Sequence, residues 1–87
     1  MINISIANDD SVDLFVSVTD ENTSPPNTLP TFRVNADQAS PIQVQEDGNG
    51  NYLIDTVSTD VNDSSRTQSV LGRTGSPGDP VSVDLSQ

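Results

Sequence analysis

The sequence has no cysteine, no histidine and no lysine, and each absence excludes a kind of chemistry. Without cysteine no disulfide can stabilise the fold, and the usual ligands of zinc, copper and iron are missing. Catalytic triads and dyads built on histidine or cysteine are excluded, as is Schiff-base chemistry on lysine. A carboxylate pair such as Glu46 and Asp55 remains, but a domain this small offers little depth for a cleft. We therefore expect a protein that is not an enzyme.

Positive charge is scarce: three arginines stand against 13 acidic residues, for a net charge of −10. Nucleic-acid binding depends on Lys and Arg that neutralise phosphates, and anionic lipid attracts basic segments. We therefore expect neither nucleic acid nor a membrane as partner. Long apolar runs are also missing, which indicates no signal peptide and no membrane span. That pattern fits a cytoplasmic protein or a domain excised from a secreted chain.

What the sequence does have is a period of two. Ile2, Ile4 and Ile6 alternate with polar or small residues, and the same alternation returns further along the chain. Because successive strand side chains point to opposite faces, this pattern places an apolar stripe on a core and leaves the other face in water. No segment has a helical period. Strands are predicted over residues 2–7, 12–19, 31–36, 42–46, 52–59, 66–71 and 81–86.

Seven short strands with turn signals every eight to twelve residues are typical of a β-sandwich. We predict an all-β fold, a small antiparallel sandwich of immunoglobulin-like or jelly-roll-like architecture, as a single domain over residues 1–87. The polar segments 8–11 and 47–51 are expected to be hairpin loops, with Gly and Asn supplying positive φ in the second. The segment 20–30 contains three prolines and is expected to be a loop.

The core is small and has few aromatics, so oligomerisation is one way to stabilise it. Ile2 and Ile4 lie on a strand that starts almost at the first residue, and we expect it to pair with a second copy at a sheet edge. Phe15 is out of phase with the apolar stripe of its strand. It is either covered by a loop or part of a contact surface. The first functional hypothesis is a non-catalytic interaction or structural module that self-associates, with an interface at Ile2, Ile4 and Phe15.

The alternative is a small-ligand module, most plausibly for carbohydrate. Polar loop residues and a neighbouring aromatic suit a sugar, and the predicted ligand-binding residues are Asp47, Asn49, Asn51 and Tyr52. Tyr52 is either a sugar-facing ring or a sheet residue with its hydroxyl at the rim.

An assisting calcium ion belongs to the same alternative. Calcium takes oxygen ligands from loops, and the predicted metal ligands are Asp9, Asp10, Asp60 and Asp63. The segment 47–51 also resembles the start of a calcium loop. An EF-hand is excluded, since Tyr52 and Ser58 stand where that loop needs Gly and Glu.

Overall fold

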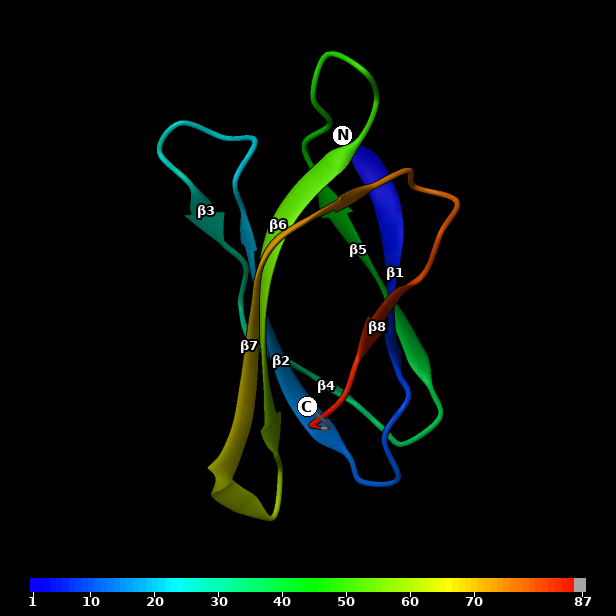
Figure 1. Ribbon diagram of the computed structural model, residues 1–87, viewed down its shortest axis with the longest axis vertical. Coiled ribbons are helices and arrows are strands. Elements are labelled where there is room, and N and C mark those ends of the chain that lie inside the picture. The colour runs from blue at the N-terminus through cyan, green and yellow to red at the C-terminus, as the bar shows by residue number, and fades with distance from the viewer. Residues whose placement is uncertain (86–87) are drawn as a thin grey trace.

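The computed structural model describes residues 1–85, which form two β-sheets packed face to face (Figure 1). The first sheet has three strands in the order β5 (Ala39–Val44), β1 (Ile2–Asn8) and β8 (Val81–Val83). The second has five: β3 (Asn27–Thr28), β2 (Leu14–Asp20), β6 (Tyr52–Asp60) and β7 (Asp63–Gly75) in that order, with β4 (Phe32–Val34) also paired to β2. The predicted all-β sandwich is confirmed.

The core lies between the inner faces of the two sheets, and the alternation predicts it well. Ile4 and Ile6 of β1 face Leu14, Val16 and Val18 of β2, all of them buried. Burying such side chains contributes roughly 1.5–3 kcal/mol each. The other buried apolar residues are Val34, Val44, Tyr52, Ile54, Val81 and Val83.

The two predicted hairpins are wrong, because both segments connect strands of different sheets. Segment 8–11 leads from β1 to β2, and segment 47–51 leads from β5 to β6. Polar side chains hold the second crossover. The backbone N–H of Gln45 donates to buried Asp20 Oδ2 over 2.7 Å, and the Asn22 amide donates to the carbonyls of Gln45 and Asn51. Turn composition marks where the chain turns, but the sheet it enters next depends on distant contacts.

Strand bounds differ most at β7, which runs from Asp63 to Gly75 where 66–71 was predicted. Gly72 has φ of 70° at a register shift opposite Asp55, and Asp55 Oδ1 accepts its N–H over 2.9 Å. A bulge of this kind absorbs an extra residue and lets a strand continue past it. The glycine that appeared to end the strand therefore bends it instead.

Other strands shift by a few residues. β5 begins at Ala39 and ends at Val44, β4 is shorter than predicted, and β3 was not predicted. β8 covers Val81–Val83, while residue 86 of the predicted last strand lies outside the described residues. β8 also pairs with β1 in parallel, so the smaller sheet is mixed and not wholly antiparallel. Eight strands are present within residues 1–85, where seven were predicted.

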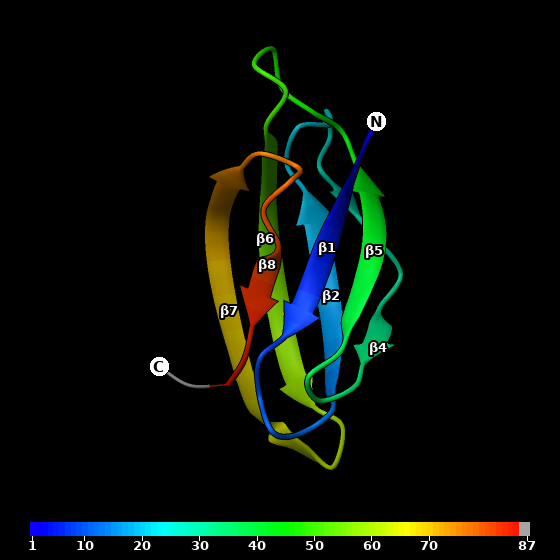
Figure 2. The same cartoon turned by 90° about the vertical axis from the view of Figure 1, so that its right-hand side faces the viewer.

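The predicted role of Ile2 and Ile4 at a sheet edge is also wrong. β1 is the middle strand of its sheet, with β5 on one side and β8 on the other (Figure 2). Ile4 is 2% exposed, and Ile2 packs against the core. An apolar stripe at the start of a chain is compatible with a central strand as well as with an edge strand, because burying its side chains is favourable in either position. β1 pairs with β5 from Ile2 to Ala7 and with β8 from Ile6 to Asn8, so it is paired on both sides at Ile6 and Ala7.

Candidate functional site

The segment 47–51 folds as a turn that uses its own polar groups. Asp47 Oδ1 accepts the backbone N–H of Asn49 over 2.8 Å and that of Asn51 over 3.0 Å. These bonds, the one from Asn51 foremost, hold the pKa of the Asp47 carboxyl below its usual range. Of the predicted sugar-binding residues, Asp47 is therefore engaged within the turn itself.

Tyr52 is unsuited to stacking on a sugar, because its ring is inside the sandwich. The residue is 6% exposed and belongs to the core cluster. Its hydroxyl oxygen is 2.9 Å from where a Cβ at Gly75 would lie, so the ring packs closely on β7. The predicted sugar-facing ring is corrected: Tyr52 falls in phase with Ile54 on the inner face of β6, and its size adds to the apolar area buried there.

The predicted calcium ligands are not gathered into a metal site. No group of three or more acidic side chains within residues 1–85 is arranged to hold a metal. The positive charge near these acids comes from an arginine. Arg66 pairs with Asp60 over 3.1 Å, and its charge lowers the pKa of Asp10 and Asp63 as a minor contribution.

Hydrogen bonds within the chain engage several of the same carboxylates. Asp10 Oδ2 accepts the N–H of Leu85 over 2.9 Å, the main cause of its lowered pKa. The Ser65 hydroxyl donates to Asp63 Oδ1 and is the main cause of the lowered pKa there. For Asp9 the backbone N–H donates to the carbonyl of Val83. The carboxylates of Asp10 and Asp63 and the backbone of Asp9 thus stabilise loops at one end of the sandwich.

A concave feature lies elsewhere, at the side of the sandwich where β7 extends past β8 (Figure 2). A cavity of about 200 Å³ opens there between the two sheets. It is lined by Thr56, Ser58, Gln68, Val70, Arg73, Ser82, Val83 and Asp84. Because β8 is short and last in its sheet, no strand within residues 1–85 covers the inner face of β7.

The cavity is polar because the inner face of β6 changes character along its length. Tyr52 and Ile54 begin that face, whereas Thr56, Ser58 and Asp60 end it. Thr56 is 1% exposed and Ser58 is 2% exposed. The buried hydroxyls of these two residues lie in the part of the core that adjoins the cavity, where burying a polar group costs free energy unless it is hydrogen-bonded.

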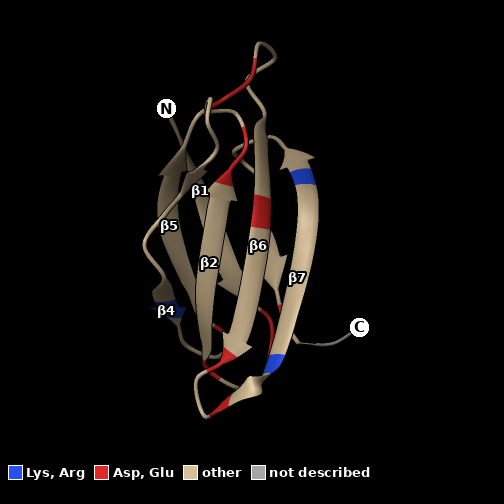
Figure 3. Ribbon diagram, turned by 90° about the vertical axis from the view of Figure 1, so that its left-hand side faces the viewer, with Lys and Arg blue, Asp and Glu red and all other residues tan. Residues whose placement is uncertain are grey.

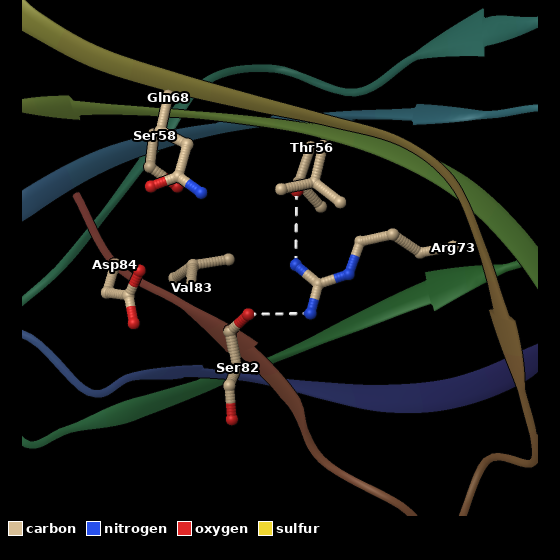
Figure 4. Close-up of a pocket in the computed structure, with 8 residues that line it drawn as sticks. Thr56, Ser58, Gln68, Arg73, Ser82, Val83 and Asp84 are labelled. Atoms are coloured by element: carbon tan, nitrogen blue, oxygen red, sulfur yellow. Dashed lines mark hydrogen bonds between the residues drawn. The ribbon is translucent and has the colours of Figure 1, made fainter. Parts of the chain in front are cut away.

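Arg73 stands at one end of the cavity with its terminal nitrogens directed inward (Figure 4). Nη1 donates to Thr56 Oγ1 over 3.2 Å and Nη2 to the carbonyl oxygen of Ser82 over 2.6 Å, which joins β7 to β6 and β8. Arg33 and Arg66 each pair with a carboxylate, but Arg73 has none within 4.0 Å among the described residues. Arg73 therefore brings to the cavity a positive charge that no described carboxylate pairs with.

Gln68 and Asp84 lie at the opposite end of the cavity from Arg73, with Val83 between (Figure 4). Gln68 Oε1 is buried, and it is the single buried side-chain oxygen or nitrogen in the described part of the chain without a hydrogen-bond partner. Such a group costs roughly 1–3 kcal/mol unless something donates to it. The sequence analysis did not single out these residues. The polar end of the β6 alternation was the available signal, but it does not say which strands face β6.

The outer face of the larger sheet carries three exposed apolar side chains. Phe15 is 42% exposed, Val57 36% and Leu71 74%. No loop buries Phe15, so that alternative is wrong, and its predicted outward direction is confirmed. Thr59 of β6 lies directly opposite Phe15, and Val57 lies opposite Ser17, so Phe15 and Val57 are diagonal neighbours. The face is otherwise rich in Ser and Thr.

β7 forms one edge of this sheet, and it is the longest strand in the described chain. It pairs with β6 on one side only. Between Ser64 and Gly75 it carries no carboxylate, although the protein has 13 acidic residues, and it holds two of the three arginines (Figure 3). Natural sheets often protect such an edge with charge or with a bulge, and here register shifts opposite Asp55 and between Thr59 and Asp60 leave residues 67–70 as the regularly paired stretch.

No family model, no curated protein and no solved structure matches this chain in the comparisons made. Within residues 1–85 no helix is long and apolar enough to cross a membrane. The functional argument therefore depends on the site geometry alone.

Proposed function

We propose that this protein is a non-catalytic interaction module that self-associates, and that two copies pair along the outer edge of β7. The observation that carries this proposal is the long one-sided strand without carboxylates. An edge strand presents a row of unpaired N–H and C=O groups to which another strand can add. Residues 67–70 offer such a row between the two register shifts of the strand.

A second copy is the favoured occupant because of charge and symmetry. Two chains of net charge −10 repel each other over most of their surfaces, whereas residues 64–75 of β7 contribute no carboxylate of their own in either copy. Antiparallel pairing of the same strand is compatible with a two-fold axis, so one edge serves both partners. Leu71, 74% exposed on this strand, would be covered in part by the pairing.

The test is the mass of the protein by light scattering across a concentration series. We expect a dimer at micromolar concentration that strengthens with added potassium chloride, because salt screens the repulsion between the two acidic chains. Ser69→Glu adds a carboxylate to each edge and should give a monomer. Ser17→Glu adds the same charge to β2, two strands away on the same outer face, and should leave the dimer intact.

The outcomes separate the edge from the face. A monomer at every concentration and salt would overturn self-association. A dimer that Ser17→Glu or Phe15→Ser disrupts, while Ser69→Glu does not, would move the interface to the outer face at Phe15. If mass stays monomeric but a strand-forming segment of another protein binds β7, the occupant is a different chain and the second-copy proposal fails.

A further inference from the structure

The geometry points to a binding site for a small zwitterion, of the α-amino acid class, in the cavity between β7 and β8. This inference is independent of self-association, because it depends on the inner face of β7 and not on its outer edge. Three features carry it: a charged fork at one end, a carboxylate at the other, and a size suited to a few heavy atoms.

The charged fork is Arg73. A guanidinium has five N–H donors, and two of its hydrogen bonds within the described chain, to Thr56 and Ser82, hold it in place. Both terminal nitrogens face the cavity, which is the geometry that receives a carboxylate. A shortage of acidic residues does not explain why no protein carboxylate pairs with Arg73. The chain has acidic groups in excess, yet none of those described approaches Arg73 within 4.0 Å, whereas Arg33 and Arg66 each have one.

The acceptor at the other end is the Asp84 carboxylate, and the Gln68 side chain lies beside it (Figure 4). An ammonium group has three N–H donors and a positive charge, which suits a carboxylate. A ligand anion alone would meet Asp84 with repulsion, and a cation alone would meet Arg73 in the same way.

The size of the cavity selects among zwitterions. At about 200 Å³ the cavity has room for a molecule of the size of a small amino acid. Val83 lies between the two polar ends, where it would contact a short apolar side chain such as the methyl group of alanine. A neutral zwitterion is also not repelled by a surface of net charge −10.

The experiment is a titration of the whole protein with L-alanine, followed by two-dimensional amide NMR. We expect saturable shifts at the Gln68 side-chain amide, the Arg73 Nε–H and the Val83 backbone amide at millimolar ligand. Propionate, which lacks the ammonium group, and ethylamine, which lacks the carboxylate, should each bind at least about tenfold more weakly. No saturable shift with L-alanine, or equal binding of either half-molecule, would overturn the proposal.

Variants separate binding from folding. Asp84→Asn and Arg73→Lys should each weaken L-alanine binding by about tenfold, since each alters one charged contact. Arg33→Gln is the control for Arg73→Gln: it changes net charge equally, but its ion pair with Asp13 lies away from the cavity. An Arg33→Gln effect as large as that of Arg73→Gln would mean general electrostatics and would count against the site.

Gln68→Leu separates stability from binding. Gln68 Oε1 is buried with no hydrogen-bond partner, so an apolar side chain of similar size should raise the unfolding temperature. Because that oxygen is closed off from the cavity, we expect L-alanine binding to persist. Loss of binding in a stable Gln68→Leu protein would contradict Arg73 and Asp84 as the two charged contacts of the ligand. Ser69→Glu, which tests the dimer, should leave L-alanine binding unchanged.

Discussion

Asn8 connects three segments at the end of β1 through a single buried side chain. Its amide nitrogen donates to the carbonyls of Val12 and Val34, both over 2.9 Å, and its Oδ1 accepts the N–H of Asp10 over 2.8 Å. The residue is 1% exposed, and all of its side-chain polar atoms have partners. A buried amide so engaged determines how the chain passes from one sheet to the other.

Replacing Asn8 should therefore be costly. Asn8→Ala leaves the carbonyl of Val34 buried without a donor and removes the support of the turn that follows β1. We expect the free energy of unfolding to fall by about 3 kcal/mol in denaturant titrations. Asn3→Ala, the same change at an exposed position of the same strand, should alter it by less than about 0.5 kcal/mol. Equal losses at the two positions would contradict the role given to the Asn8 amide.

Other single residues show how far the sequence predicts the site. The period of two correctly places Phe15 outside and Leu14 inside, because burial follows alternation locally. The same rule also places Tyr52 in the core, in phase with Ile54, and the sugar-facing alternative for its ring went against that phase. The Arg73 cavity could not be predicted, since it exists only because β8 is too short and too far along its sheet to cover β7.

Among the connecting elements, the turn from β5 to β6 places different demands on its two glycines. Gly50 has φ of 80°, whereas Gly48 is not in the positive region, and neither has an atom within 4 Å of a built Cβ. We expect Gly50→Ala to lower the free energy of unfolding by about 1 kcal/mol and Gly48→Ala by less than about 0.5 kcal/mol. Paired thermal melts measure this. Loss of stability only in Gly48→Ala would refute the turn geometry.

Elements are also where prediction from sequence reaches its limit. The strands themselves are local patterns, so most were located within a few residues. Sheet membership is not local: β8 pairs with β1 in parallel, and segments 8–11 and 47–51 resemble hairpins although they cross between sheets. Buried Asp20 and part-buried Asn22 decide the second crossover through contacts more than 20 residues away in sequence, which composition does not reveal.

At the scale of the whole molecule, carboxylates shape how stability depends on pH. Hydrogen bonds lower the pKa of four of them below the usual 3.8: Asp10, Asp13, Asp47 and Asp63. Glu21 is opposite in sign, because its hydrogen bond with the Asp55 side chain raises its pKa above the usual 4.5. A lowered pKa stabilises the fold above the ordinary value, and a raised pKa stabilises it below.

Stability should therefore pass through a maximum in mildly acidic solution. As pH falls through the raised pKa of Glu21, its protonation relieves repulsion and stability rises. As pH falls further, below 3.8, the four aspartates lose their advantage and stability declines. Glu21→Gln should remove the rise and leave the decline. Melting temperatures across this range test both, and an unchanged rise in Glu21→Gln would show that another group causes it.

The net charge of −10 on 87 residues makes a final prediction about salt. Folding brings the carboxylates together, so their repulsion opposes it, and salt screens them as the Debye length falls from about 30 Å at 0.01 M to about 8 Å at 0.15 M. The melting temperature should rise over that range with potassium chloride. Arg66 already lies among Asp10, Asp60 and Asp63, so a specific calcium site is not needed to offset these acids.

Calcium and magnesium at matched ionic strength complete the comparison. Since general screening depends on ionic strength, we expect all three chlorides to shift the melting temperature equally. A bound calcium ion would instead stabilise the folded state by mass action, well beyond potassium at the same ionic strength, and magnesium would not match it because it dehydrates reluctantly. A calcium-specific shift that Asp60→Asn abolishes would revive the metal site at this end of the sandwich and would make Arg66 a competitor of the ion.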